Sequence, residues 1–309
     1  MVNGLTGPPP VNFSTSQLLN SSTFHSPSMF PTHYLLPDAA LQALTPAERQ
    51  ALPWAGLSEL RAYIAQPAAF NTPDGNPPSG GIVPLIMAFD KPLHQTSFQL
   101  VAQVRRTLTR ALGGQKVKIG HAGTLDPLAT GVMVICVGRA TKLIEQMQAG
   151  EKEYTATLQL GATTPSYDLE HPVDQTYPTA HITREAIEQA LEQFRGPIMQ
   201  VPPAFSACKV NGKRAYDMAR QGQQVELQAK PLHIHELELV SFDASTMQLT
   251  LRIVCSKGTY IRALARDIGQ ALGSGAHLTA LRRTRVGYFT AARCFDANQL
   301  PDDLKQEKK

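Results

Sequence analysis

The order of apolar and polar residues along the chain predicts several β-strands after residue 80. Residues 131–138 are almost continuously apolar, which is typical of a strand buried on both faces. Residues 151–161 and 247–255 alternate instead between apolar and polar side chains, so we expect strands with one buried and one solvated face. A further apolar run, residues 81–90, predicts a strand that ends at an Asp-Lys-Pro sequence.

Residues 96–112 have the spacing of an amphipathic helix, because apolar side chains recur at intervals of three and four residues. The apolar positions are Phe98, Val101, Val104, Leu108 and Leu112. The opposite face carries Arg105, Arg106 and Arg110. Residues 256–273 repeat this helical pattern, and we expect shorter helices at 139–148 and 183–195.

The connections between these elements indicate the fold class. Some strands follow one another through short turns, such as the hairpin expected at Asn211-Gly212, whereas others are separated by helices. There is no strict alternation of strand and helix. We therefore predict an α+β protein with a mixed, mostly antiparallel sheet that is flanked by helices.

Residues 1–80 differ in composition from the rest of the chain. They contain twelve of the 23 prolines and begin with a tract rich in Ser, Thr and Asn. We expect residues 1–40 to be largely disordered and residues 71–81 to be a linker. Between them, Thr45 has the position of a helix N-cap and Glu48 that of its capping-box partner, and a second short helix is expected at 58–66.

The chain thus divides into three predicted parts. Residues 1–80 form a proline-rich extension, residues 81–295 a folded domain, and residues 296–309 a charged tail. Because the extension is net acidic and rich in proline, we expect it to be dispensable for chemistry.

Charge and cysteine content indicate the partner and the compartment. The net charge is +4, and the extension accounts for −2, which leaves +6 on the rest of the chain. A moderately basic body favours a polyanion such as RNA, but an ordinary solubilising surface has the same charge. The four cysteines include no Cys-x-x-Cys pair, and there is no signal peptide or membrane-spanning run, so we expect buried free thiols and a cytoplasmic protein.

The stretch GHAGTLDPLATG, residues 120–131, holds a single carboxylate, Asp126, just before the buried strand. Its glycines allow close backbone approach, and Pro127 fixes the chain after the acid. A carboxylate held in this way is compatible with a nucleophile, a general base or a metal ligand, and equally with an aspartate that caps a turn. The spacing alone leaves these roles open.

Over twelve consecutive positions this stretch resembles the signature of the TruB family of tRNA pseudouridine synthases. Similar motifs occur in the family's order on both sides, with Asp90-Lys91-Pro92 and Thr96-Ser97 upstream. The downstream motifs are GRATKL, EKEYTATLQLG, PPAFSACKVNGKRAYDMARQG, CSKGTYIRALARDIG and HLTALRR. The resemblance covers roughly residues 81–290 and implies a pseudouridine synthase-like fold. Two residues depart from the family pattern. His94 stands where the family usually has glycine, and Pro165 stands where it often has aspartate.

The resemblance implies an enzyme, without a cofactor, that isomerises uridine-55 in the T loop of tRNA to pseudouridine. It implies catalytic roles for Asp126 and Arg262, and we expect the arginine to pair bidentately with the aspartate and keep it ionised. The implied substrate-binding residues are His121, Tyr154, Tyr260, Leu281 and Lys142. His121 would take the place of the flipped base, and Tyr154 would lie against the extruded uracil.

Some of these residues are also compatible with structural roles. Tyr154 lies on an alternating strand and has the pattern of a core residue. The arginines at the end of the resemblance, Arg282, Arg283 and Arg285, are compatible with phosphate contacts or with a solvated face.

Two further classes of function stay open. A metal-dependent hydrolase would use His121, Asp126 and Asp168, and a non-catalytic RNA-binding or tRNA-folding module would keep the fold alone. A pseudouridine synthase that acts on another RNA is a further alternative. Because the chain ends about twenty residues after LRRTRVG, we expect the short form of the family, without a C-terminal RNA-binding domain. We expect a monomer that binds the T-stem-loop of tRNA with its catalytic domain.

Overall fold

The structure is a computed structural model that describes residues 33–51, 54–65, 84–206, 208–210, 213–221 and 227–304 of the chain. The chain from Thr32 onward forms one compact unit. No helix in the described ranges is both long and apolar enough to cross a membrane.

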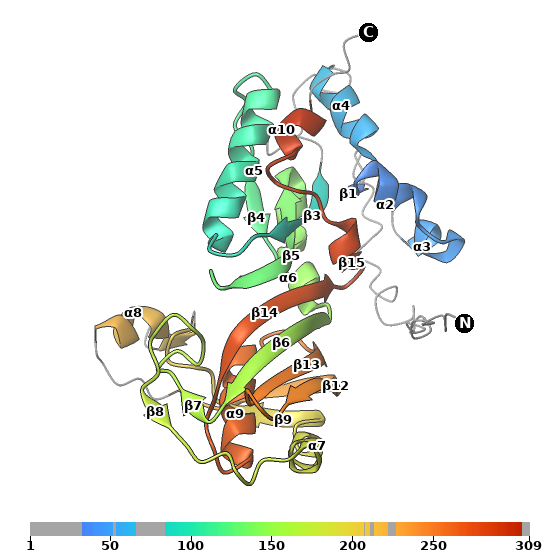
Figure 1. The fold of residues 1–309 in the computed structure, drawn as a ribbon. Helices are drawn as coiled ribbons and strands as arrows, with labels where there is room; N and C mark the ends of the chain where they lie inside the picture. The colour runs from blue at the N-terminus through green and yellow to red at the C-terminus, as the bar shows by residue number, and fades with distance from the viewer. Residues whose placement is uncertain are drawn as a thin grey trace. The chain divides into compact units, whose positions relative to one another are not determined.

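One mixed sheet of eleven strands organises this unit (Figure 1). The strands are β1 (His33–Leu35), β2 (Trp54–Ala55), β3 (Leu85–Lys91), β4 (Ile119–His121), β5 (Ala129–Val137), β6 (Lys152–Leu160), β9 (Gly196–Gln200), β12 (Lys230–Asp243), β13 (Gln248–Cys255), β14 (Ala276–Val286) and β15 (Phe289–Thr290). Their order is β2-β1-β3-β5-β14-β6-β13-β12-β9, with β4 paired to β5 and β15 paired to β14. Only β1–β2, β1–β3 and β5–β14 are parallel among these pairs, which confirms the mixed, mostly antiparallel sheet.

Two smaller hairpins stand beside the main sheet. β7 (Ala162–Thr163) pairs with β8 (Gln175–Thr176), and β10 (Lys209–Val210) pairs with β11 (Lys213–Arg214). In the second hairpin Val210 is opposite Lys213, which leaves two residues for the turn. The two residues of the predicted Asn-Gly turn lie outside the described ranges.

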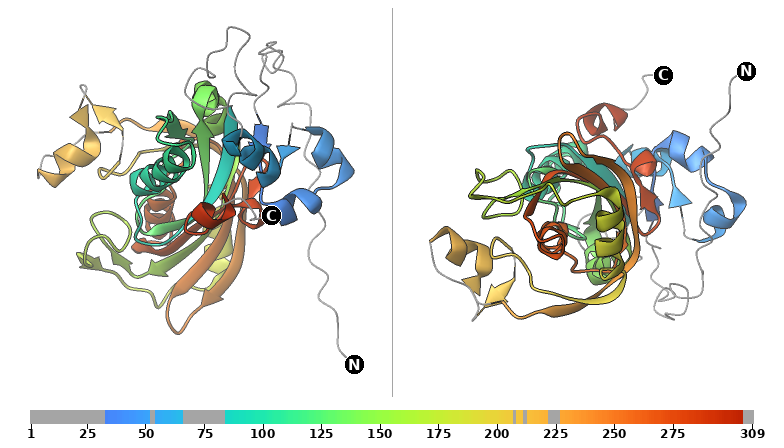
Figure 2. Two further views of the ribbon diagram at one scale, coloured as in Figure 1. Left: turned by 90° about the horizontal axis from the view of Figure 1, so that it is seen from above. Right: turned by 60° about the horizontal axis from the view of Figure 1, so that its bottom comes forward.

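Helices complete the α+β fold. They are α2 (Asp38–Gln42), α3 (Pro46–Ala51), α4 (Leu57–Ala65), α5 (Ser97–Ala111), α6 (Ile144–Ala149), α7 (Arg184–Glu192), α8 (Ala215–Arg220), α9 (Ile261–Ala271) and α10 (Leu300–Asp303), with 3-10 turns η3 (Gly138–Leu143) and η4 (Ala291–Arg293). The sheet curves around α7 and α9, and α9 packs on β14 and β6 (Figure 2). The apolar residues of α9, β6 and β13 meet there in one core cluster.

The hydrophobic pattern predicted β3, β5, β6, β13, α5 and α9, with an error in the buried face of α5, but it did not predict β9 or β14. Thr96 and Gln99 cap the helix reciprocally, and Val101, Val104 and Leu108 are buried as expected. Phe98, however, is 72% exposed. The buried stripe runs through Ser97, so Phe98 lies about a quarter turn away from its centre, given 3.6 residues per turn.

The N-terminal extension is in part ordered, contrary to our expectation for residues 33–40. β1 pairs in parallel with β3, with Tyr34 opposite Ile86, and Leu35 and Leu36 have no exposed surface. The predicted capping box of α3 is confirmed, since Thr45 and Glu48 exchange hydrogen bonds of 3.0 and 3.3 Å. By pairing with β3, β1 covers an edge of β3 that would otherwise offer free backbone groups. Residues 1–32 and the predicted linker lie outside the described ranges.

The end of the described chain also packs on the unit. Leu300 is fully buried and Leu304 is 6% exposed, and α10 contacts α5. Described residues before residue 80 and after residue 295 thus contribute to the core. The division of the chain at residues 80 and 295 stays a prediction.

The burial of Leu36 can be tested by mutation. If the extension belongs to the fold, Leu36→Ala lowers the free energy of unfolding by about 2–5 kcal/mol, the usual loss for a buried leucine. Leu169→Ala is the matched control: this leucine is 54% exposed, so the loss stays within about 0.5 kcal/mol. Urea denaturation of the full-length proteins measures both. Equal stabilities for the two variants would mean that the extension does not pack on the sheet.

Candidate active site

Asp126 lies in the loop that connects β4 to β5. The carboxylate side chain is 40% exposed, whereas its neighbours Leu125 and Ala129 are buried at 4% and 2% exposure. The amide of Ala129 donates to the carbonyl of Asp126 at 3.0 Å and closes the turn that starts β5. The loop therefore presents one accessible carboxylate from a backbone that is anchored in the core on both sides.

The turn before α5 fixes this loop by hydrogen bonds. Ser97 Oγ donates to the carbonyl of Leu125 at 2.8 Å and accepts from its amide at 2.9 Å. The amide of His94 donates to the carbonyl of Pro127 at 2.8 Å. His94 has φ of 63°, so the turn keeps a left-handed conformation although a histidine stands where the family usually has glycine.

Lys91 supports the same turn from inside. Its side chain is fully buried, and Nζ donates to the carbonyls of Pro92 and Gln95 at 2.9 and 2.7 Å. Burial lowers the pKa of Lys91 to about 8, and the nearby charge of Asp126 opposes this shift. Lys91 thus contributes a buried amine next to the loop that carries Asp126.

On the other side of the loop, strands β5 and β14 approach each other very closely. Gly131 on β5 lies opposite Arg283 on β14, and a Cβ on Gly131 would stand 2.1 Å from the carbonyl oxygen of Arg283. The side chain of Arg283 is 2% exposed and donates to the carbonyls of Val132 at 2.7 Å and Gly123 at 3.1 Å. Arg283 is therefore neither a phosphate contact nor part of a solvated face, the two roles that we considered; it holds the loop.

Arg262, in the first turn of α9, forms the predicted ion pair with Asp126. Its Nε lies 2.9 Å from Asp126 Oδ2 and 3.6 Å from Asp168 Oδ2. Its two terminal nitrogens donate to the carbonyls of Ser166 at 3.2 Å and Phe205 at 2.9 Å. The bidentate pairing that we expected is therefore absent, because the fork of the guanidinium is occupied by backbone.

Asp168 is the buried partner of Arg262. The side chain is 8% exposed and accepts from Ser166 Oγ at 2.6 Å and from the amide of Glu170 at 3.0 Å. Arg262 therefore lies between one buried and one accessible carboxylate. Asp126 is the one that a substrate can reach.

Tyr154 and Leu281 lie on the face of the sheet that α9 covers. Tyr154, on β6, is 7% exposed and belongs to the same core cluster as Leu125 and Ala129; Leu281, on β14, packs against this cluster. Burial raises the pKa of Tyr154, while the charge of Arg283 opposes the shift, so the phenol is protonated at neutral pH. The structure thus brings Asp126, Arg262, Tyr154 and Leu281 to one place.

The other predicted residues, Tyr260, His121 and Lys142, lie on separate elements. Tyr260 caps α9, and its hydroxyl is 3.3 Å from Cys208 Sγ. His121 ends β4, and burial lowers its pKa. Lys142 is exposed in η3. Neither His121 nor Lys142 forms a hydrogen bond or ion pair with Asp126 or Arg262 within the described ranges, so their roles stay predictions.

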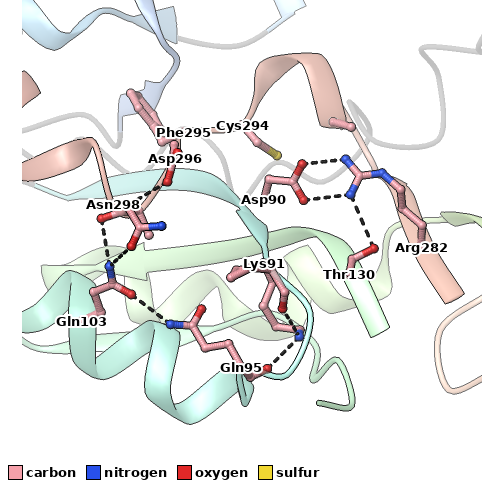
Figure 3. A pocket seen from close by; sticks show the side chains of 13 residues that line it. Asp90, Lys91, Gln95, Gln103, Thr130, Arg282, Cys294, Phe295, Asp296 and Asn298 are labelled. Atoms are coloured by element: carbon pink, nitrogen blue, oxygen red, sulfur yellow. Dashed lines mark hydrogen bonds and ion pairs between the residues drawn. The ribbon is translucent and has the colours of Figure 1, made fainter. Parts of the chain in front are cut away.

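A pocket of about 450 Å³ lies beside the loop, between β3, α5 and the chain after β15 (Figure 3). Arg282 closes it through a two-pronged pair with Asp90, at 3.0 and 2.6 Å. Gln95 donates to Gln103, which donates in turn to Asn298 at 3.0 Å. Arg282 is thus engaged within the protein, as is Arg285, which faces Glu151 at 3.8 Å.

Across the described ranges, no three His, Cys, Asp or Glu side chains are grouped so that they could hold a metal ion. Asp126 and Asp168 share an arginine instead.

Two family models match this chain. The model described as "TruB family pseudouridylate synthase (N terminal domain)" matches residues 109–261, and "tRNA pseudouridylate synthase B C-terminal domain" matches residues 262–309. The second match includes α9 and β14 of the main sheet. It does not support our expectation that the family's C-terminal domain is missing.

Known proteins show the same relationship. The chain is 60% identical over 223 residues to "tRNA pseudouridine synthase B" of Phocaeicola vulgatus, covering 72% of this chain and 94% of that protein. It is 58% identical over 225 residues to the protein of the same name from Bacteroides thetaiotaomicron, with the same coverage. The solved "Structure of H/ACA RNP bound to a substrate RNA containing 2'-deoxyuridine" superposes with a TM-score of 0.51 and 26% identity, over 70% of this chain and about half, 52%, of that chain.

The fold and the site thus define a pseudouridine synthase, an isomerase built on a curved mixed sheet. The chain belongs to the TruB family of pseudouridylate synthases.

The contact between Gly131 and Arg283 predicts a large effect of one methyl group. Gly131→Ala strains a residue with φ of 104° and also drives Cβ into the backbone of β14, so we expect a loss of more than about 3 kcal/mol in unfolding free energy. Gly196→Ala is the control: its φ is 81°, but no atom lies within 4 Å of the added Cβ, so only the dihedral cost of about 1–2 kcal/mol applies. Urea denaturation compares the unfolding free energies of the two variants. Similar losses in both would show that β5 and β14 tolerate separation.

Proposed function

We propose that this protein isomerises uridine-55 in the T loop of tRNA to pseudouridine, with Asp126 as the catalytic carboxylate. Isomerisation of a tRNA uridine is the activity of its family and of the relatives named above. The observation that carries the assignment to Asp126 is its ion pair with Arg262, at 2.9 Å, on a carboxylate that is 40% exposed. The position within tRNA follows from the resemblance of the loop to the family signature.

The reaction needs no external reagent. The bond between C1′ of the ribose and N1 of uracil breaks, and a bond between C1′ and C5 forms after the base has turned. The proton that C5 loses is balanced by the proton that N1 gains. A fixed carboxylate can act as the nucleophile or stabilise positive charge on the sugar, and the proposal includes both.

The surroundings of Asp126 suit an extruded base. A nucleotide must leave its stack before the carboxylate can reach it, at a cost of a few kcal/mol. The ring of Tyr154 and the side chain of Leu281 offer an apolar wall beside the carboxylate, and the neutral phenol adds no charge to it. Arg262 pairs with Asp126 from a largely buried position and can orient this carboxylate toward a base.

We propose further that a monomer binds the T-stem-loop in the cytoplasm. The body of the chain is basic, and local shape and phosphate contacts dominate recognition of folded RNA. His121, Tyr260 and Lys142 have binding roles in this proposal, around the carboxylate.

Neutralising Asp126 tests the catalytic assignment. Asp126→Asn keeps the size of the side chain, and Arg262 keeps Asp168, so we expect the melting temperature and tRNA affinity to change little. Single-turnover pseudouridine formation on tRNA should fall by several orders of magnitude, because the variant has no charge at the reacting centre.

Asp174→Asn is the matched control, an exposed aspartate at which the rate should stay within twofold. If Asp126→Asn loses activity only in proportion to a lower folded fraction, the aspartate has a structural role and the catalytic assignment is wrong.

The choice of substrate can be tested with a short RNA. A T-stem-loop minihelix should be modified at a rate within about tenfold of full-length tRNA, because the contacts that we propose lie within that arm. Its affinity should fall as salt rises, since phosphate contacts release counterions. A requirement for the anticodon arm, measured with a matched set of truncated RNAs, would exclude this mode of recognition.

A further inference from the structure

An exposed groove of about 520 Å³ lies on α5 and the turn before it, next to the loop of Asp126. We call it the α5 groove; its lining includes Leu93, His94, Phe98, Ala102 and Arg106. Phe98 is 72% exposed and Leu93 is 50% exposed. Two large apolar side chains side by side in water are costly unless a partner covers them.

The α5 groove is rigidly connected to the candidate active site. The five hydrogen bonds of His94, Ser97 and Lys91 described above either join this segment to residues 125–127 or close the turn itself. Whatever fills the groove therefore lies within a few residues of Asp126.

The charge around the α5 groove fits a polyanion. Between Asp90 and Asp126 the chain has six Lys or Arg residues and no Asp or Glu. Arg106 and Arg110 are exposed and follow Phe98 and Ala102 at intervals of four residues along α5. This row extends for about 18 Å at 1.5 Å per residue. It places an aromatic ring at the end near the carboxylate and positive charge farther away.

We propose that the α5 groove binds the tRNA substrate, with an unpaired nucleotide stacked on Phe98 and the adjoining phosphates at Arg106 and Arg110. This inference rests on the proposed function, since it assigns a second contact surface to the same substrate. Aromatic side chains beside basic ones are the usual platform for single-stranded nucleotides, and such stacking tolerates any base. The surface thus holds the loop strand next to the flipped uridine.

Full-length variants test the proposal through tRNA affinity. Phe98→Ala should weaken binding about tenfold, within the range expected for one stacked base, and Phe98→Tyr should restore it to within twofold. Arg106→Gln should reduce the slope of log affinity against log salt by about one. Val240→Ala, an equally exposed apolar residue on β12 at 57%, is the control and should bind like the unmodified protein.

The melting temperature of each variant shows that a change in affinity is not a change in folding. Unchanged tRNA affinity in Phe98→Ala, with an active unmodified protein, would overturn the assignment of the groove while the proposed function stands. An unmodified protein that does not isomerise tRNA would overturn the proposed function itself. If Phe98→Ala instead dissociates a dimer in sedimentation, a second copy of the chain occupies the groove and the RNA assignment is wrong.

Discussion

The short parallel contact between β5 and β14 is the constraint on which this structure depends. Within the described ranges it is the link in the sheet order between the half that contains β3 and the half that contains β6, and it pairs only three residues on each strand. Gly131 makes the approach possible, because a Cβ would enter the backbone of Arg283. The side chains of Arg282 and Arg283 leave opposite faces of β14, and both cross the contact to the half that contains β3, Arg282 to Asp90 and Arg283 to the carbonyl of Gly123.

The candidate site exists because of this junction. Asp126 belongs to the loop that enters β5, whereas Arg262, Tyr154 and Leu281 come from the other half of the sheet and the helix that covers it. Separating the strands would separate the carboxylate from its arginine. The buried guanidinium of Arg283 donates to backbone carbonyls of the loop and fixes the loop in place. The side chain of Asp126 can therefore stay accessible while the backbone of the loop stays fixed.

Surfaces outside the junction divide into two kinds. At the edge of β3, strand β1 of the extension covers backbone and apolar side chains, so this edge is closed by the chain itself. At the start of α5, Leu93 and Phe98 stay exposed beside a run of basic residues. The first surface contributes stability, and the second is available to a partner.

The sequence by itself predicted strands β3, β5, β6 and β13 and helices α5 and α9, and it singled out Asp126 as the candidate catalytic residue. Burial of one face imposes periods of two and 3.6 residues on the chain, so β5, β6 and α9 could be predicted from local pattern, and the loop of Asp126 from its resemblance to a family. The tertiary structure alone decided the rest, because it depends on residues that are distant in the chain. From the sequence Arg283 has the pattern of a surface cation, and it is buried only because its strand pairs with Gly131. Phe98 fits the apolar stripe of α5, but the orientation in which the helix packs leaves it exposed. Residues 33–40 look unstructured by composition until β3 offers them a free edge, because a strand of three residues is stable only through its partner.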